Sequence, residues 1–304
     1  MITYYRRTIK DHKLTELKKF EKGCWIHAVH PSKEEIEYLH KTFSLDKQNL
    51  RSGLDKYEVP RVEFVNKNLY AILKIISPPP YEKVMHTILI VVGNDFILTL
   101  SKYKPVSLEK IFQSKIKFIT TQKLKCLLWF FSLINRDFEY STNDIVRLVN
   151  AKKESIRKLN EKDINILLEQ ESILNNFVSA YYHTNLVYER IKKNIRFYEQ
   201  DNEILDDLMI EAKQGFELCE LSLKTISNIR NHFEVLVSHK LNKIITLLTV
   251  FTVLISLPAA ISGIYGMNIA LPMQENPYAF SIIVFIIVLL WAGLLFYFKK
   301  TNVI

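Results

Sequence analysis

Residues 244–268 read IITLLTVFTVLISLPAAISGIYGMN, an apolar run that ends in a Gly-Met-Asn motif at residues 266–268. A second apolar run covers residues 279–298 and stops at Lys299 and Lys300. About twenty helical residues, with a rise of 1.5 Å each, span the hydrocarbon of a bilayer, and both runs reach that length. The sequence therefore predicts two transmembrane helices joined by a short turn, where the asparagine of the motif places a polar oxygen at one face of the membrane.

The 304-residue chain is basic, with a net charge of +9 and 24% charged residues. That balance could indicate nucleic acid, but no motif interleaves aromatic and basic residues, so we expect no nucleic-acid partner. Basic charge beside apolar spans is typical of the cytoplasmic flank of a membrane protein. Lys240 and Lys243 precede the first span, whereas the joining loop contains Glu275 and neither Lys nor Arg. The positive-inside rule thus predicts a multi-pass protein of the cell (plasma or inner) membrane with both termini cytoplasmic.

The sequence carries no signature of an enzyme. It holds only seven glycines and lacks a Walker A loop, a GxSxG elbow and an HExxH helix, so we expect no catalytic activity. Its three cysteines, Cys24, Cys126 and Cys219, are far apart and match no metal-binding spacing. They are expected to be reduced, buried thiols.

Residues 1–150 are predicted to form a mixed α/β domain. Residues 24–29 are a strand candidate, and Ser32 with Glu35 has the spacing of a capping box that opens a helix. The other candidate elements are a β-rich stretch at 61–76, a hairpin over 84–100 that turns at 93–95, and a helix from about 121 to 135.

Residues 151–240 are predicted to form long helices. Apolar residues recur every seven positions from Leu205 to Ile226, and no proline occurs from Leu205 to Leu257. One helix of about sixty residues, roughly 90 Å long, would then continue into the first span. Its apolar stripe is expected to pack against the helices of residues 152–200, against copies of itself around an axis, or against both.

The predicted fold class is an α+β cytosolic domain followed by long stalk helices and two transmembrane helices. The expected segments are a cytosolic α/β domain (1–150), stalk helices (151–240), the first transmembrane helix (241–265), an extracellular loop (266–278), the second transmembrane helix (279–298) and a cytosolic tail (299–304).

One face of the first predicted transmembrane helix carries seven residues at alternating steps of three and four, and all of them except Ile245 are small or polar. They are Asn242, Ile245, Thr249, Thr252, Ser256, Ala259 and Gly263. Such a stripe fits either tight packing between helices or a wall wetted by water. Two spans cannot enclose a pathway, so a pore would need several copies of the chain. Neither apolar run, 244–265 or 279–298, contains Asp, Glu, Lys, Arg or His, and such a wall suits a cation that keeps most of its water shell, as Mg²⁺ does.

The chain resembles the CorA family of magnesium channels, whose signature is Gly-Met-Asn after the first of two spans. The resemblance extends through residues 263–265, Asn242 and the C-terminal lysine pair, and through residues 57–63, 69–73 and 96–100 of the cytosolic domain. It implies a funnel-shaped homopentamer in the lipid bilayer, with five first spans lining the pore and the second spans outside them. It also implies influx of a divalent cation, chiefly Mg²⁺ with Co²⁺ and Ni²⁺ as further candidates, driven by the membrane potential.

The same resemblance implies roles for individual residues. Gly266, Met267 and Asn268 would ring the outer mouth and select the hydrated ion, with Asn268 as its ligand. The rest of the pore wall would consist of a polar ring of Asn242 at the inner mouth, an apolar constriction of Ile245 and Leu248 that gates by dewetting, and the stripe residues Thr249, Thr252, Ser256, Ala259 and Gly263.

The family resemblance further implies gating by cytosolic Mg²⁺, bound by acidic residues between neighbouring copies. Asp206 or Asp207 matches the position on the long helix, and Glu82 is the candidate partner. Two other functions stay open: a carrier of Zn²⁺ or another divalent cation with the same architecture, and a membrane-anchored sensor or scaffold. The polar stripe counts against the scaffold, since an anchor needs only apolar bulk.

Overall fold

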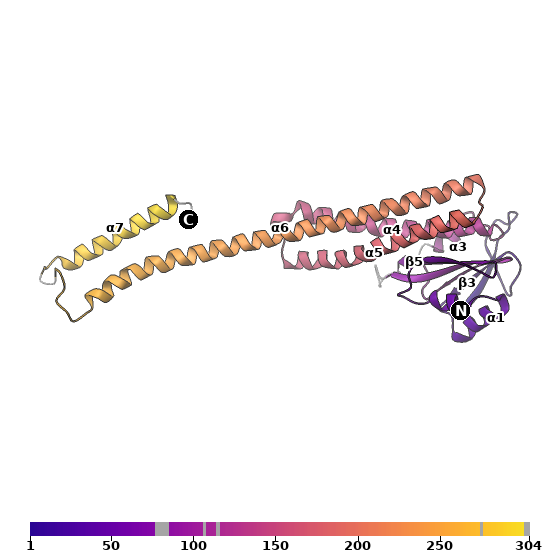
Figure 1. Cartoon of the computed structure of the whole chain (residues 1–304), viewed down its shortest axis with the longest axis horizontal. Helices are drawn as coiled ribbons and strands as arrows, with labels where there is room; N and C mark the ends of the chain where they lie inside the picture. Colours follow the sequence, from indigo (N-terminus) through magenta and orange to yellow (C-terminus); the bar gives the residue numbers. More distant parts are fainter. Residues whose placement is uncertain (77–84, 106–107, 114–115, 274–275, 301–304) are drawn as a thin grey trace. The chain divides into compact units, whose positions relative to one another are not determined.

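The computed structural model describes residues 1–304 except 77–84, 106–107, 114–115, 274–275 and 301–304. It divides into two compact units, residues 1–229 and residues 230–304, which we call the N-terminal and the C-terminal unit. Helix α6 (Glu199–Tyr265) begins in the first unit and ends in the second, and α7 (Ala279–Lys300) belongs to the second (Figure 1). The single long helix expected from the seven-residue repeat is confirmed, and it covers 67 residues.

The N-terminal unit is built on one mixed sheet with the strand order β2-β1-β3-β7-β6-β5-β4. Its strands are β1 (Ile2–Arg6), β2 (Thr15–Leu17), β3 (Cys24–Val29), β4 (Arg61–Val65), β5 (Asn68–Ile76), β6 (Met85–Val92) and β7 (Phe96–Ser101). Strands β3 and β7 pair in parallel, and the other neighbours pair antiparallel. The predicted strand at 24–29 and the predicted hairpin around 93–95 are both confirmed.

The β-rich stretch at 61–76 is two strands rather than one. It turns at Asn66 and Lys67, whose φ angles are 52° and 66°. Two successive residues with positive φ are what a tight two-residue hairpin loop requires, because that turn matches the twist of the flanking strands. Strands β4 and β5 then pair antiparallel, with Val65 opposite Asn68.

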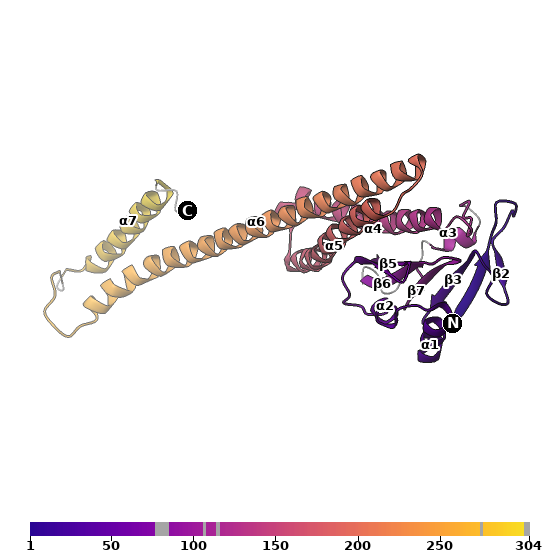
Figure 2. The ribbon, with the colours of Figure 1, turned by 45° about the vertical axis from the view of Figure 1, so that its right-hand side comes forward.

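Helices cover both faces of the sheet (Figures 1 and 2). Helices α1 (Lys33–Phe43) and α2 (Lys47–Ser52) lie on one face, and α4 (Lys123–Glu154) and α5 (Glu161–Asn194) lie on the other. Two short elements connect the chain: α3 (Glu109–Phe112) precedes α4, and a 3₁₀ turn (Ile156–Lys158) lies between α4 and α5. The capping box at the start of α1 is confirmed: the Glu35 amide donates to Ser32 Oγ, and the Ser32 amide donates to Glu35 Oε2. The helix expected over 121–135 continues to Glu154.

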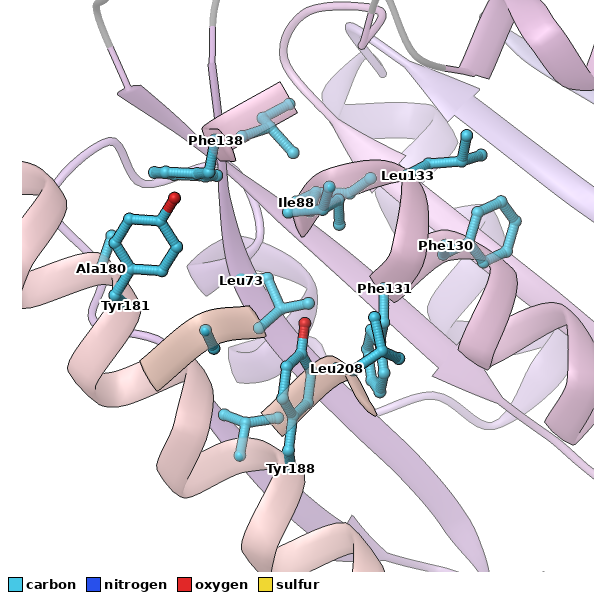
Figure 3. Packing of buried hydrophobic residues seen from close by; sticks show 14 of the residues in the cluster. Leu73, Ile88, Phe130, Phe131, Leu133, Phe138, Ala180, Tyr181, Tyr188 and Leu208 are labelled. Atoms are coloured by element: carbon cyan, nitrogen blue, oxygen red, sulfur yellow. The ribbon is translucent and has the colours of Figure 1, made fainter. Parts of the chain in front are cut away.

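The core has two parts because successive strand residues face opposite sides of the sheet. On β5, Leu73 packs with α4, α5 and the N-terminal part of α6, whereas Ile72 packs toward α1 and α2. The apolar repeat of α6 is buried in this unit, including Leu205, Ala212 and Ile226. The expected packing of the stripe against helices of the same chain is therefore confirmed, and Figure 3 shows part of this packing.

A buried polar network joins the three long helices. The Tyr188 hydroxyl on α5 donates to Asn135 Oδ1 on α4 at 2.8 Å, and Asn135 Nδ2 donates to the Leu208 carbonyl of α6 at 3.1 Å. Gly215 lets α6 approach α5, since a Cβ there would lie 2.3 Å from the ring of Tyr181. Such a network, with each partner satisfied, fixes one arrangement of the helices.

The three cysteines are free and buried, as expected from their spacing. Burial raises the pKa of the Cys219 thiol to about 11 and raises the pKa of Cys24 and Cys126 as well. All three side chains therefore stay protonated at neutral pH and serve as small apolar groups in the core.

Candidate ion pathway

The C-terminal unit exposes its apolar side chains. Within the apolar part of α6 only 6% of the residues are buried in the chain, and in the corresponding part of α7 none is. Both helices are long and apolar enough to cross a membrane. Apolar surface of this extent calls for lipid or another protein surface to cover it, so the two spans predicted from the sequence have the exposure expected of membrane helices.

The side chains of α6 are shielded unequally within the C-terminal unit. Val250 is only 4% exposed, and the half-buried residues gather near it on one face of the helix. They are Thr246, Val253, Leu254, Leu257, Pro258 and Ile261. The predicted polar stripe lies on another face, and each of its seven members is exposed. The stripe is therefore not used for packing within the chain.

The stripe hydroxyls hydrogen-bond to the backbone of their own helix. Thr249 Oγ1 donates to the Ile245 carbonyl and Thr252 Oγ1 to the Leu248 carbonyl, both at 2.8 Å. Ser256 Oγ donates to the Val253 carbonyl at 3.1 Å. A hydroxyl has one proton to donate and two lone pairs that accept. With the proton directed to the backbone, each oxygen presents an acceptor along the stripe.

The apolar residues assigned to a constriction are also uncovered. Ile245 is 59% exposed and Leu248 is 66% exposed. Asn242, one turn before Ile245, is exposed as well. The single chain thus leaves both the polar and the apolar members of the predicted pore wall free to meet other copies, water or lipid.

The Gly-Met-Asn motif directly follows Tyr265, the last residue of α6. The Gly266 amide donates to the Ser262 carbonyl at 2.9 Å, and the Met267 amide donates to the Ile264 carbonyl at 3.2 Å. A Cβ at Gly266 would lie 3.2 Å from the Ser262 oxygen, so the tight turn favours glycine. Asn268 follows directly; its side chain is exposed and makes no hydrogen bond within the residues that the structure describes. Its amide is thus available to a ligand.

One contact between α6 and α7 was not anticipated from the sequence. Trp291 of α7 donates its indole N–H to the backbone carbonyl of Leu254 on α6, at 2.8 Å. Leu254 stands four residues before Pro258, the proline inside α6. This spacing is the sequence signal that could have predicted the contact, because a proline has no amide N–H to donate to the carbonyl four residues earlier.

Two of the three residues assigned to Mg²⁺ sensing, Asp206 and Asp207, belong to the part of the chain that the structure describes. Asp206 pairs with Lys192 of α5, Asp207 is exposed, and Glu82 lies outside the described residues. Within the described ranges, no group of three His, Cys, Asp or Glu side chains is placed to hold a metal ion.

Comparison with known proteins gives a family match along nearly the whole chain. Residues 20–300 match the family described as CorA-like Mg²⁺ transporter protein. The chain is 24% identical over 314 aligned residues to the cobalt/magnesium transport protein CorA of Methanocaldococcus jannaschii, covering 97% of this chain and 96% of that protein.

Solved structures show the same fold. The complete structure of the CorA magnesium transporter from Methanocaldococcus jannaschii aligns with a TM-score of 0.87 at 21% identity, over 100% of this chain and 99% of that one. The full-length CmaX protein aligns with a TM-score of 0.76 at 15% identity, over 99% of this chain and 97% of its own. The cytoplasmic domain of ZntB from Vibrio parahaemolyticus aligns with a TM-score of 0.66 at 10% identity, covering 78% of this chain and 98% of that domain.

Proposed function

Since this chain belongs to the CorA family of Mg²⁺ transporter proteins, we propose that it forms a homopentameric channel through which hydrated divalent cations, chiefly Mg²⁺, enter the cytoplasm. The observation that carries the proposal is the exposed Asn268, three residues beyond the end of α6, together with the exposed polar stripe on that helix. In this arrangement the two spans cross the cell membrane, and both chain ends lie in the cytoplasm.

The chemistry of the stripe supports a hydrated cation as cargo. Water molecules around a cation point their oxygens inward and their protons outward. Thr249, Thr252 and Ser256 direct their protons to the helix backbone and present oxygen lone pairs instead. Such a wall accepts hydrogen bonds from the outer face of the shell, so the ion need not lose its waters. Because Mg²⁺ dehydrates reluctantly, this wall suits it better than one that must replace the shell.

At the proposed outer mouth, Asn268 can interact with the hydrated ion in the same way as the stripe hydroxyls. Its amide oxygen accepts a hydrogen bond and it carries no charge, so it can hold a water of the shell without trapping the ion electrostatically. Gly266 and Met267 shape the turn that presents it. Five copies would place five such amides in a ring.

The driving force needs no nucleotide. A membrane potential of about 100 mV is worth about 2.3 kcal/mol for each elementary charge, and therefore about 4.6 kcal/mol for a divalent cation moving inward. The neutral wall offers no fixed charge to oppose that movement.

We extend the proposal to Mg²⁺ as a regulator. Asp207 is the ligand on which this part rests, because its side chain is exposed and makes no ion pair within the described parts of the chain. Asp206 is already held by Lys192. Glu82 of a neighbouring copy remains the proposed partner carboxylate, and a cation shared between copies would tie their cytosolic domains together.

Asn268→Ala is expected to abolish Mg²⁺ uptake into liposomes while the variant still assembles like the wild type. The physical reason is that alanine removes the amide that holds the hydrated ion and leaves the helix intact. Uptake is followed with an internal Mg²⁺ indicator, and repetition with Co²⁺, Ni²⁺ and Zn²⁺ ranks the ions.

Asn276→Ala is the matched control, since Asn276 lies in the same loop but its side chain accepts a hydrogen bond from the Tyr278 amide at 2.9 Å. This control is expected to keep its uptake. Undiminished Mg²⁺ uptake by Asn268→Ala would remove the selectivity role, and a chain that carries Zn²⁺ in preference to Mg²⁺ would replace the proposed cargo.

A further inference from the structure

Proline 258 interrupts the hydrogen-bond ladder of α6 within its apolar part. In an unbroken helix the amide of residue 258 would donate to the carbonyl of Leu254, but proline carries no amide hydrogen and its ring crowds that carbonyl. The Leu254 oxygen therefore loses its ordinary partner. Ser256 lies between the two residues, so the interruption falls inside the polar stripe.

The C-terminal unit supplies the missing donor from its other helix. The indole N–H of Trp291 on α7 reaches the Leu254 carbonyl at 2.8 Å, a normal hydrogen-bond distance. The bond joins positions 37 residues apart. Residues 244–265 and 279–298 contain no Asp, Glu, Lys, Arg or His, so these parts of the two helices are held together by neutral hydrogen bonds and packing, without ion pairs.

The hydrogen bond between Trp291 and Leu254 matters because it lies in a part of the chain expected to be inside the membrane. No water is at hand in the hydrocarbon of a bilayer, so a carbonyl without a donor is strongly unfavourable there. Prolines inside transmembrane helices are tolerated where neighbouring helices satisfy the freed carbonyl. Trp291 is 39% exposed, and its indole combines a large apolar surface with a single N–H that needs an acceptor.

We propose that Trp291 is a positioning residue of the ion pathway: its indole N–H takes the place of the amide that Pro258 lacks and fixes the direction of α6 at the proline. The proline separates two parts of the polar stripe, Asn242 to Ser256 before it and Ala259 with Gly263 after it. When the indole bond is made, α7 holds both parts in one register, so that the hydroxyls before the proline and the small residues Ala259 and Gly263 after it face the ion along one side of the helix. This inference rests on the proposed function, because it assumes that the stripe lines the pathway.

Without the bond, the Leu254 carbonyl must find another donor. It can do so if α6 bends or admits a water at the break, and either change turns the part of the stripe after Pro258 relative to the part before it. The expected consequence is slower ion uptake, although Trp291 touches no ion.

A double-mutant cycle tests the proposal. Trp291→Phe removes the N–H and keeps an aromatic ring, and Pro258→Ala restores the amide at residue 258, so that the Leu254 carbonyl no longer needs the indole. In the wild-type background, Trp291→Phe is expected to slow Mg²⁺ uptake by about three- to fifteenfold, the range that measured hydrogen bonds between membrane helices give, and to lower the Tm of the detergent-solubilised protein. In the Pro258→Ala background the same change is expected to alter both quantities little.

Trp129→Phe is the matched control. Trp129 lies on α4 in the N-terminal unit, so its replacement is expected to have the same effect with or without Pro258. The indole N–H band in the ultraviolet resonance Raman difference spectrum, wild type minus Trp291→Phe, gives a direct signature and is expected to show a strong hydrogen bond.

Equal effects of Trp291→Phe in both backgrounds would mean that only ring packing matters, and would overturn the proposal, as would the absence of any effect. If Trp291→Phe alone fails to fold, recovery in the Pro258→Ala background supports the proposal and failure in both backgrounds overturns it. The double-mutant cycle can be measured on Tm alone, without any ion flux. If the wild type carries no Mg²⁺, the proposed function fails, and the cycle still decides whether the indole replaces the proline amide.

Discussion

His27 lies at the centre of an aromatic cluster in the sheet. It is 5% exposed, its Nδ1 lies 3.0 Å from Thr99 Oγ1, and the rings of Trp25 and Phe112 surround it. Trp25 Nε1 donates to the same Thr99 oxygen at 2.8 Å, so the threonine proton is free to bond to His27. Burial, with a smaller contribution from Lys104, lowers the pKa of His27 to about 4. The side chain is therefore neutral in the folded protein at neutral pH.

The sign of the resulting pH dependence follows from this pKa. An unfolded histidine titrates near pH 6.5, so below that pH the unfolded chain binds the proton more readily than the folded one. Stability is fully retained above about pH 6.5 and falls as the pH drops toward 4. At pH 5 the loss is about 2 kcal/mol, from 1.36 kcal/mol per pKa unit.

His27→Gln is expected to be less stable at pH 7.5 and to lose less Tm than the wild type between pH 7.5 and pH 5.0. The remaining pH dependence includes His86, whose pKa burial also lowers. Identical Tm losses in the two proteins would show that His27 does not bear the cost of protonation.

Single residues also mark what a sequence can and cannot reveal. The spacing of Ser32 and Glu35 was enough to predict a capping box, because both partners lie within one helical turn. The hairpin turn at Asn66 and Lys67 was missed, since Lys67 is not a residue that usually adopts positive φ. Trp291 was missed because its partner is a backbone carbonyl on another helix, which no periodic pattern encodes.

At the scale of elements, the polar face of α6 is the feature whose effect on ion uptake can be measured. Thr252 lies on that face and is exposed, whereas Thr246 lies among the half-buried residues on the face of Val250. The two residues have the same chemistry and lie on one helix, less than two turns apart. They therefore separate the effect of position from the effect of side-chain type.

Thr252→Val is expected to lower the initial rate of Mg²⁺ uptake by about tenfold, because one lost hydrogen bond is worth about 0.5–1.5 kcal/mol and the loss recurs in each copy around the axis. Valine keeps the shape of threonine and removes only the oxygen. Thr246→Val, measured in the same liposome assay, is expected to retain its rate. A larger effect at Thr246 than at Thr252 would place the pathway on the other face.

Secondary-structure elements were predictable where apolar residues recur with a clear period. The repeat from Leu205 to Ile226 predicted a long helix, and it is one continuous helix. Helix α4 was predicted only to residue 135, because beyond it the buried Phe138, Ile145 and Val149 are separated by many charged and polar residues. Burial against α5 and α6 sustains that second half, and such tertiary support does not show in local composition.

At the scale of the whole molecule, the chain cannot enclose a pathway by itself, since two spans have no closed interior. The polar stripe and the Gly-Met-Asn motif predicted a pore, but the number of copies came only from the family resemblance. The number of copies in a symmetric assembly is set by contacts between chains. The sequence of one chain shows these contacts only as surfaces that its own fold does not cover.

The detergent-solubilised particle is expected to have a protein mass of five times the 35.8 kDa of one chain. Native mass spectrometry, which removes the detergent, measures this directly, and Asn268→Ala should give the same mass. A particle of one or two chains would contradict the proposed pore, because the stripe would then face lipid.

The buried state of the three cysteines has a practical consequence. Alkylating reagents such as maleimides react with exposed thiolates, and Cys24, Cys126 and Cys219, the three that the sequence contains, are hidden and protonated. A cysteine introduced on the surface would consequently be the one site in the protein to react quickly. Spin labels and fluorophores can then be attached in the native background, and a scan of water-soluble probes along 242–263 would map which positions face water.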